Sequence, residues 1–195
     1  MKLIFATNNQ FKVKEIQPEV GNFFELVTLK EAGINTDIPE PFNTLEENAT
    51  HKSKTISELT GLDCFSEDTG LEVYSLNGEP GVKSARYSGE EKSFEKNIDK
   101  LLEKLKSKPE RKARFRTVIS LMLNGTEKQF EGICEGEIIE IMKGDRGFGY
   151  DPVFVPFGSD KTFAQMTINE KNEYSHRKKA VNKLVNYLHK IKQHN

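Results

Sequence analysis

Hydrophobic and polar positions follow two periods along the chain, which divides it into helical and extended segments. Apolar residues recur every three or four positions, as in an amphipathic helix, over residues 44–60, 91–106 and 175–189. A shorter helix is expected to begin near residue 10 and to end at Pro18. Strands are expected where short apolar or alternating runs lie between turn residues, at 3–6, 23–29, 64–66, 71–76, 113–123, 130–134, 137–142 and 153–155.

Cap and turn residues mark where these elements begin and end. Thr44 and Glu47 form the pattern of a capping box before the 44–60 helix, and Gly61 follows its end. Asn77-Gly78 and Asn124-Gly125 predict tight hairpin-type turns. Helices towards both ends of the chain flank a long run of strands, which predicts an α/β or α+β domain built on a mixed sheet.

Length, charge and cysteine content limit the classes of function. The 195 residues suit a single domain over 1–195, either one core or two closely packed lobes. A net charge of -1 argues against a general nucleic-acid coat, which needs a positive face. Cys64 and Cys134 form no CxxC pair, which favours reduced thiols in a cytoplasmic protein over a zinc site. No segment is long enough to span a membrane.

Lys52 interrupts the apolar stripe of the 44–60 helix, between Ala49 and Ile56. Lysine is rarely buried without a partner. Either its ammonium group reaches solvent along the flexible stem of the side chain, or it faces a charged site. The acids that follow on the next expected strand favour the second interpretation.

Those acids belong to Glu67-Asp68-Thr69-Gly70, which predicts a turn that interrupts a strand region. The segment is either a solvated turn or a carboxylate pair that binds Mg²⁺ and polarises a water molecule. Mg²⁺ prefers oxygen ligands and usually takes one or two carboxylates together with substrate phosphates. Glu40, in the preceding loop, is either a further ligand or a plain surface acid.

Thr7-Asn8-Asn9 lies where the first strand gives way to a helix, and Lys12 follows it. A helix N-terminus presents free N–H groups and partial positive charge, which suits a phosphate. Thr7 and Asn9 could donate hydrogen bonds, and Lys12 adds charge. The alternative interpretation is that Asn9 is an ordinary N-cap.

Two later segments contain groups that could contact a base. Phe148-Gly149-Tyr150-Asp151 places two aromatics in a loop, where they either stack on a base or anchor the loop in the core. Lys171 precedes Ser175-His176-Arg177, in which Ser175 matches an N-cap. Buried cations at the positive end of a helix need an anion or a base carbonyl to receive them, so His176 and Arg177 either read a base or are exposed first-turn residues.

Taken in order, these segments resemble the inosine triphosphate pyrophosphatases, also called non-standard purine nucleoside triphosphate (dITP/XTP) pyrophosphatases. The resemblance extends from near residue 1 to near residue 190, and five or more spaced motifs in order are highly specific. Two positions depart from it, since many members have a glycine in the first loop and an Asp-Asp pair where this chain has Glu67-Asp68. The motifs are Phe5-Ala6-Thr7-Asn8-Asn9, Glu47-Asn48-Ala49, Glu67-Asp68-Thr69-Gly70-Leu71, Ser84-Ala85-Arg86-Tyr87-Ser88-Gly89, Phe148-Gly149-Tyr150-Asp151-Pro152 and Ser175-His176-Arg177.

The resemblance implies a two-lobed α/β fold around a long mixed sheet, an active site in the cleft between the lobes, and a homodimer. It implies that Asp68 is the general base and that Lys52 faces the phosphates. Glu40 and Asp68 would bind Mg²⁺. The substrate-binding residues that it implies are Thr7, Asn8, Asn9, Lys12 and Thr69 for the triphosphate side, and Phe148, Gly149, Tyr150, Asp151, Lys171, His176 and Arg177 for the base.

The implied reaction is Mg²⁺-dependent hydrolysis of ITP, dITP or XTP to the monophosphate and pyrophosphate, which would keep these bases out of DNA and RNA. Asp68 would deprotonate the attacking water, while Lys12 and Lys52 neutralise the leaving group. Donors such as His176 or Arg177 would select the purine 6-carbonyl. Two alternatives stay open. One is the related septum-formation family of nucleotide pyrophosphatases, and the other is a nucleotide sensor without turnover.

Overall fold

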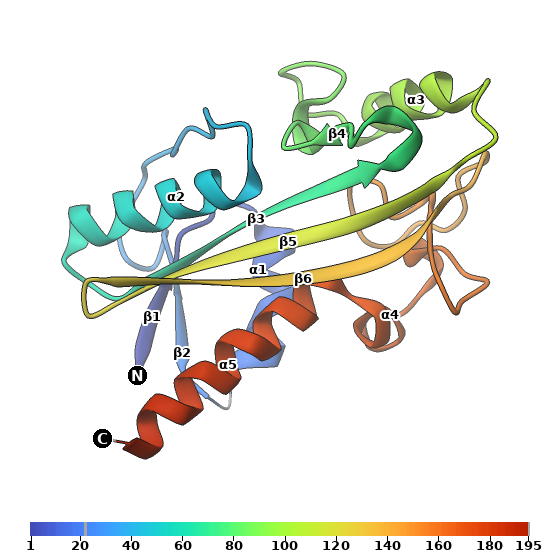
Figure 1. Cartoon of the computed structure of the whole chain (residues 1–195). Coiled ribbons are helices and arrows are strands. Elements are labelled where there is room, and N and C mark those ends of the chain that lie inside the picture. Colours follow the sequence, from blue (N-terminus) through green and yellow to red (C-terminus); the bar gives the residue numbers. More distant parts are fainter. Residues whose placement is uncertain (22, 195) are drawn as a thin grey trace. The chain divides into compact units, whose positions relative to one another are not determined.

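The computed structural model describes residues 1–21 and 23–194. It has an α/β fold (Figure 1). In chain order its helices and strands are β1 (Lys2–Phe5), α1 (Gln10–Val20), β2 (Glu25–Thr28), α2 (Leu45–Thr60), β3 (Cys64–Val73), β4 (Pro80–Gly81), α3 (Phe94–Leu105), β5 (Lys112–Leu123), β6 (Thr126–Ile138), β7 (Phe154–Pro156), α4 (Ile168–Tyr174) and α5 (His176–His194). Short 3-10 helices lie at Tyr74–Leu76, Ser84–Arg86 and Phe163–Gln165.

The strands form one mixed sheet with the order β2-β1-β3-β5-β6-β7, and β4 pairs with β3 off this path. β1 runs parallel to both β2 and β3, while the β3–β4 and β6–β7 pairs are antiparallel. Parallel neighbours need a crossover connection. Helix α1 connects β1 to β2, and helix α2 connects β2 to β3. The predicted α/β fold on a mixed sheet is confirmed.

The chain divides into two compact units. Unit 1 contains 1–68, 117–132 and 177–195, and unit 2 contains 69–116 and 133–176. Strands β3, β5 and β6 each contribute residues to both. A single functional domain over 1–195 and a cleft between lobes stay predictions.

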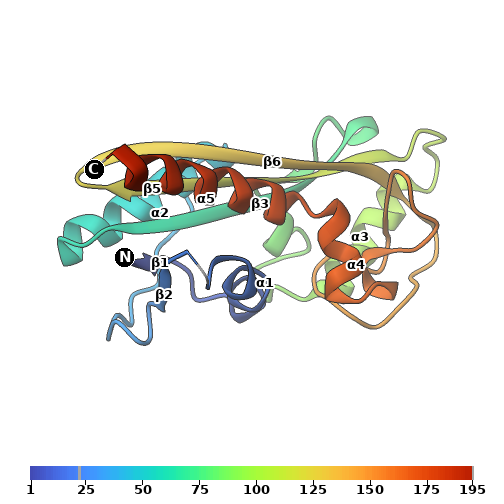
Figure 2. The same cartoon turned by 90° about the horizontal axis from the view of Figure 1, so that it is seen from below.

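Both faces of the sheet are covered by helices within unit 1. Leu3 and Phe5 of β1 point to the face where α1 and α5 pack, in one cluster with Ile16 and Leu184. Ile4, next to both of them, belongs to the cluster on the opposite face, which contains Ile56 of α2. Figures 1 and 2 show α2 on one side of β3 and α5 on the other. Successive side chains of a strand point to opposite faces, so a strand buried on both faces is apolar at every position.

Unit 2 has its own core beneath α3. Leu101 of α3 packs with Phe115 of β5, Phe154 of β7 and Phe163. Strand alternation turns Glu72 of β3 away from this core, where it accepts hydrogen bonds from Arg114 (2.7 Å) and Arg116 (3.0 Å). One face of this part of the sheet is therefore apolar and packed, and the other carries a ladder of paired charges.

The caps predicted for the 44–60 helix are confirmed, and so is the tight turn at Asn124-Gly125. Thr44 Oγ1 accepts a hydrogen bond from the N–H of Glu47, and Gly61 ends α2 in the left-handed conformation. Asn77 and Gly78 have positive φ angles, but residues 74–79 connect β3 to β4, and the strand expected over 71–76 ends at Val73, where a 3-10 helix follows. Asn124 and Gly125 also have positive φ angles and alone connect β5 to β6. A two-residue hairpin turn needs this conformation, which asparagine and glycine adopt most easily.

Several elements differ from the expected ones. α1 continues through Pro18 to Val20, whose side chain is buried in the unit 1 core beside that of Ile16. Packing of this last turn therefore outweighs the missing N–H of proline. The runs expected as two strands at 130–134 and 137–142 belong to one strand, β6, which ends at Ile138. Helix α4 was not predicted, although its capping box, Thr167 with Glu170, is visible in the sequence.

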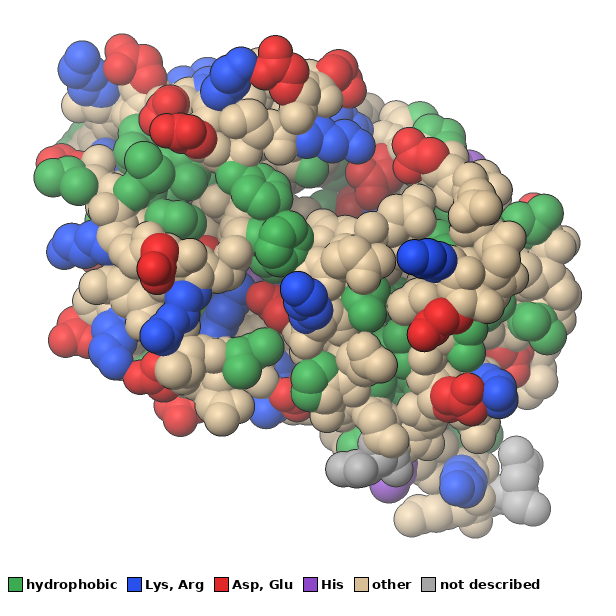
Figure 3. Space-filling view, turned by 180° about the vertical axis from the view of Figure 1, so that it is seen from behind, with side chains coloured by type: hydrophobic (Ala, Val, Ile, Leu, Met, Phe, Trp, Pro, Cys, Tyr) green, Lys and Arg blue, Asp and Glu red, His purple; other side chains and the backbone are tan. Residues whose placement is uncertain are grey.

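The surface carries mixed charge. On the face shown in Figure 3, acidic and basic side chains are interspersed among polar and apolar ones, as the net charge of -1 suggests. Among the described residues, no helix combines the length and the apolar composition that are needed to cross a bilayer.

Candidate functional site

The two acids at the centre of β3 point to opposite faces of the sheet. The predicted turn at Glu67-Asp68-Thr69-Gly70 is wrong, because all four residues lie within the strand. Asp68 faces α2, where its Oδ1 lies 3.1 Å from Lys52 Nζ. Glu67 instead faces Lys12 of α1 and Arg177 of α5. Side chains alternate along a strand, so adjacent acids do not form the expected carboxylate pair.

Gly70 has a packing role rather than a turn role. It lies within β3, beside the backbone of β4. A Cβ atom at this position would lie 2.7 Å from the carbonyl oxygen of Gly81. The close approach of two backbones therefore requires glycine here. In the sequence, the same glycine suggests a turn.

Lys52 is held between two carboxylates in unit 1. Its ammonium donates to Glu40 Oε1 at 2.5 Å and to Asp68 Oδ1 at 3.1 Å, and the residue is only 6% exposed. Burial alone would lower the pKa of Lys52, but Asp68 and Glu40 outweigh it and raise the pKa. The lysine is therefore protonated and paired rather than solvated, as the functional interpretation of the apolar stripe predicted.

Asp68 has the electrostatic setting of a candidate base. Burial raises its pKa above the ordinary aspartate value, Lys52 opposes this rise, and the nearby carboxylate of Glu40 adds to it. A raised pKa gives the ionised carboxylate more affinity for a proton than an exposed aspartate has. This is the property that a general base uses.

Glu40 and Asp68 are also the candidate ligands for a divalent cation. Both carboxylates contact the same ammonium group, so they converge on one centre of positive charge. Two carboxylates suit Mg²⁺, which usually completes its octahedron with water and substrate phosphates. No cluster of three or more histidine, cysteine or acidic residues suitable for a metal occurs among the described residues. Two carboxylate donors are compatible with Mg²⁺, whereas structural zinc sites are built from cysteine and histidine.

A second buried charge cluster centres on Glu67. Its two carboxylate oxygens lie 3.0 Å from Lys12 Nζ and 3.0 Å from Arg177 Nε. Arg177 also pairs with Glu15 of α1. Burial alone would raise the pKa of Glu67, but Arg177 and Lys12 outweigh it and lower the pKa to about 2. Glu67 therefore ties a strand to two helices through ion pairs.

The start of α1 is capped by Asn9, as the alternative interpretation of this segment has it. Asn9 Oδ1 accepts hydrogen bonds from the N–H groups of Phe11 (3.0 Å) and Lys12 (3.3 Å), and Thr7 Oγ1 accepts one from Asn9. Asn8 donates to the carbonyl of Thr36, which ties this turn to the loop before α2. Lys12 follows one turn later on the same helix.

Several residues predicted to read a base come together in unit 2. Lys171 Nζ donates to Asp151 Oδ2 at 2.7 Å, and both side chains are buried. The same carboxylate oxygen accepts from the N–H of Phe148 at 3.0 Å. Lys171 Nζ also lies 5.4 Å from the centre of the Phe148 ring and 5.1 Å from that of Phe163. A cation, a carboxylate and an aromatic ring therefore meet at the 147–151 loop.

The two aromatics of this loop have different roles. Tyr150 is buried and donates from its hydroxyl to the carbonyl of Ser84 at 3.0 Å, so it anchors the loop. Phe148 is partly exposed and lies near Phe94. Position 147 requires glycine, because a Cβ atom there would lie 2.0 Å from Asp151 Oδ2. Phe148 is therefore the aromatic that is available for stacking on a base.

His176 and Arg177 are adjacent in sequence but belong to different clusters. The His176 ring stacks on Phe115 in unit 2, with centroids 4.7 Å apart and planes 12° apart. Arg177 pairs with Glu67 and Glu15 in unit 1. Both are buried, so the interpretation as exposed first-turn residues is wrong. Ser175, expected as an N-cap, is buried directly before α5.

A profile of a known protein family matches this chain from residue 3 to residue 187, which is nearly its whole length. The chain belongs to the Ham1 family.

Individual Ham1 relatives agree with this assignment. The dITP/XTP pyrophosphatase of Christiangramia forsetii is 51% identical, covering 97% of this chain and all of that protein. That of Flavobacterium johnsoniae is 47% identical, covering 96% and 98%. The solved Staphylococcus aureus Ham1 protein superposes with a TM-score of 0.88 at 39% identity, covering 97% and 98%. A Ham1 protein from Coxiella burnetii gives 0.90 at 34%, covering 97% and 99%.

Some residues that contact the predicted site residues of this Ham1 chain were not themselves predicted from the sequence. Glu15 carries a signal in the sequence, because it lies three positions after Lys12 and so on the same face of α1. Phe115 and Phe163 carry none, since nothing in the sequence separates them from ordinary core residues. Asn48 belongs to the Glu47-Asn48-Ala49 motif but was not predicted to have a role of its own, and it is fully buried.

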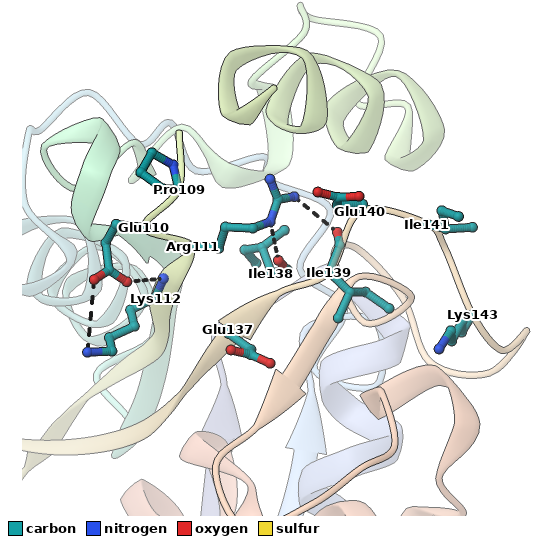
Figure 4. A pocket seen from close by; sticks show the side chains of 10 residues that line it. All are labelled: Pro109, Glu110, Arg111, Lys112, Glu137, Ile138, Ile139, Glu140, Ile141 and Lys143. Atoms are coloured by element: carbon teal, nitrogen blue, oxygen red, sulfur yellow. Dashed lines mark hydrogen bonds and ion pairs between the residues drawn. The ribbon is translucent and has the colours of Figure 1, made fainter. Parts of the chain in front are cut away.

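A surface cavity of about 450 Å³ lies elsewhere in unit 2 (Figure 4). Arg111 donates from its guanidinium to the carbonyls of Ile138 (2.6 Å) and Ile139 (3.3 Å) on its wall. None of the residues that the sequence predicted for the site lines it. They are Pro109, Glu110, Arg111, Lys112, Glu137, Ile138, Ile139, Glu140, Ile141 and Lys143.

Proposed function

We propose that this chain is a nucleoside triphosphate pyrophosphatase that hydrolyses the non-standard purine nucleotides ITP, dITP and XTP to the monophosphate and pyrophosphate. The observation that carries the proposal is Lys52, a buried lysine held between Glu40 and Asp68. Full-length relatives named dITP/XTP pyrophosphatases support the substrate class. Removal of these nucleotides would keep their bases out of DNA and RNA.

The triphosphate is proposed to bind the cations of unit 1. Lys12 and Lys52 carry the positive charge that a pyrophosphate leaving group needs, and both are paired with carboxylates in this structure. Phosphoryl transfer requires mainly positioning and charge neutralisation, so no covalent nucleophile is needed. Asp68, whose pKa is raised, accepts the proton of the attacking water.

Mg²⁺ is the proposed cofactor, and Glu40 and Asp68 are the side chains that would hold it. When bound, Mg²⁺ would supply positive charge to the phosphate oxygens. Lys52 contacts both of these carboxylates, so it would exchange part of its pairing with them for pairing with phosphate. The hydrogen-bond donors of the lysine then face the group that leaves.

The base is proposed to be recognised by Lys171 and Asp151, with Phe148 as the stacking ring. Inosine and xanthosine present a 6-carbonyl acceptor beside an N1–H donor. A cation next to a carboxylate matches this pair, whereas adenine presents the reverse polarity. A mismatch would leave buried polar groups unpaired, which a hydrogen-bonding site rejects strongly.

Pyrophosphate release from ITP, dITP, XTP, GTP, ATP and dTTP, with and without Mg²⁺, tests the proposal. We expect turnover of the first three that depends on Mg²⁺. Preference for dTTP or another nucleotide would favour the septum-formation alternative, and binding without release would favour the sensor. The homodimer and the cytoplasmic location stay predictions, and light scattering of the purified protein would measure the first.

A further inference from the structure

The loop before α2 carries Glu40 but has little regular structure of its own. Residues 34–42 belong to no helix or strand, and most of the segment from 35 to 44 is exposed (Figure 1). The proposed function places a metal ligand in this loop. Exposed loops are mobile unless they are anchored, and a ligand must be held close to its working geometry. Something outside the loop must therefore fix it.

Asn48 supplies such an anchor from the first turns of α2. Its Oδ1 accepts a hydrogen bond from the N–H of Phe42 at 3.0 Å, and its Nδ2 donates to the carbonyl of Phe42 at 3.1 Å. The amide thus pairs with both backbone groups of one residue, as a neighbouring strand would. The Asn48 side chain is fully buried, while the Phe42 residue is 40% exposed. The helix, not the loop's own packing, therefore sets the backbone at Phe42.

Phe42 lies only two residues from Glu40. Pro41 lies between them, and its ring fixes one of the two backbone torsions of that residue. The backbone path from the anchored peptide to Glu40 is therefore short, and one of its torsions is fixed. At its other end Glu40 contacts Lys52, which lies one turn of α2 beyond Asn48.

We propose that Asn48 is a positioning residue, which holds Glu40 for metal binding by fixing the backbone of Phe42. The proposal rests on the proposed function of Glu40 and adds a residue that does not touch the metal. Asparagine is suited to this place because one side chain carries both a donor and an acceptor. Aspartate and alanine each lose at least one of the two bonds.

Mn²⁺ binding without nucleotide, followed by electron paramagnetic resonance, provides the test. Asn48→Ala is expected to weaken Mn²⁺ binding roughly tenfold or more, the scale on which residues behind metal ligands act. Glu40→Gln is expected to weaken it as well. In the Glu40→Gln background, Asn48→Ala should cause little further loss, because its effect passes through the same ligand.

Two further comparisons separate positioning from general stability. Phe42→Pro removes the donating N–H from the loop without touching the core, and it should weaken Mn²⁺ binding, whereas Phe42→Ala keeps the N–H and should not. Asn97 of α3 is a matched control, since it is buried and its amide bonds residues of the 84–88 segment in unit 2. Asn97→Ala should lower the melting temperature without changing Mn²⁺ affinity.

The possible failures differ from one another. If Glu40→Gln binds Mn²⁺ weakly while Asn48→Ala and Phe42→Pro bind it normally, Asn48 does not position the ligand. An equal loss from Asn48→Ala in both backgrounds would also overturn the proposal, because the effect would bypass Glu40. If Glu40→Gln binds Mn²⁺ as the wild type does, Glu40 is not a ligand, and both the proposed metal site and the role of Asn48 are wrong.

Discussion

Lys52 shows how much a single residue can predict. A lysine in an apolar helical stripe conflicts with its surroundings, and that conflict identified a buried charge site. Glu67 and Asp68 show the limit of this approach. Their separation onto two faces depends on β3 running through them, and the glycine that made the segment look like a turn is required by the backbone of a distant residue, Gly81.

Replacement of Asp68 tests the assignment of the base. Asp68→Asn keeps the size of the side chain and a hydrogen-bonding group beside Lys52, so the fold should be retained. Turnover of ITP should fall by roughly 10²-fold or more, the scale of a lost general base. Asp99→Asn, on the exposed face of α3, is the control and should leave turnover unchanged. A nearly normal rate in purified Asp68→Asn would remove Asp68 from this role.

Replacement of Lys52 tests the charge balance of the same cluster. The sequence alone suggested that Lys52→Met would keep or raise the melting temperature, because methionine suits an apolar stripe. The structure changes that expectation, since the variant leaves the carboxylates of Glu40 and Asp68 close together without their cation. We expect turnover to collapse and the melting temperature to fall in metal-free buffer.

Added Mg²⁺ should then raise the melting temperature of Lys52→Met more than that of the wild type, because it replaces the lost charge. Differential scanning calorimetry with and without Mg²⁺ measures this difference. Lys54→Met, exposed on the same helix, should behave like the wild type. Normal turnover together with a loss of stability that Mg²⁺ does not restore would make Lys52 a structural residue.

At the scale of the element, local signals predicted helices better than strands. The caps of α2 identified its limits, because a cap acts on neighbouring residues. The end of α1 at Val20 and the single long β6 depend on packing against distant segments, which local patterns do not contain. The ion pairs of Glu67 belong to the same class, because they join a strand to the starts of two helices.

Acid unfolding tests the Glu67 cluster. Its pKa lies near 2 in the folded protein, against 4.5 for an ordinary glutamate. A carboxyl group with a lowered folded pKa stabilises the protein above its unfolded pKa, and this contribution disappears as the pH falls towards the folded pKa. The stability that Glu67 provides should therefore be complete near neutral pH and lost between about pH 4.5 and pH 2. The shift corresponds to about 3 kcal/mol.

The variant Glu67→Gln should unfold more easily at pH 7, because Arg177 and Lys12 lose their buried counter-ion. Urea unfolding at several pH values measures the difference from the wild type, which should shrink as the pH falls below 4.5. Glu103→Gln, on the exposed side of α3, is the matched control. A difference that stays constant down to pH 2 would show that Glu67 is not ionised in the fold.

At the scale of the whole molecule, the sequence predicted the fold class and the family, while the grouping of side chains came from the structure. Motifs in a fixed order are recognisable without any knowledge of contacts. Adjacent His176 and Arg177, by contrast, were expected to act together, and they lie in clusters of different units. The start of a helix turns successive side chains by about 100°, so neighbours in sequence face different surroundings.

Because His176 and Arg177 belong to different clusters, base selectivity should be tested with variants of each cluster. Arg177 is paired with the carboxylate that also holds Lys12, whereas Lys171 meets Asp151 and Phe148. Lys171→Met should therefore lower kcat/KM for ITP and XTP while leaving the weak ATP activity almost unchanged, since the lost donor serves only a 6-carbonyl. A hydrogen bond from a charged donor is worth about 1.5–3 kcal/mol, so the ITP to ATP ratio should fall roughly ten- to a hundredfold. Lys161→Met, which removes an exposed lysine paired with Glu170 in the same unit, should leave the ratio unchanged.

Arg177→Met should reduce both activities by a similar factor, because Arg177 pairs with Glu67, which also pairs with Lys12, a proposed phosphate ligand. If Arg177→Met changes the ratio and Lys171→Met does not, the base is read from the start of α5 rather than by the pair of Lys171 and Asp151.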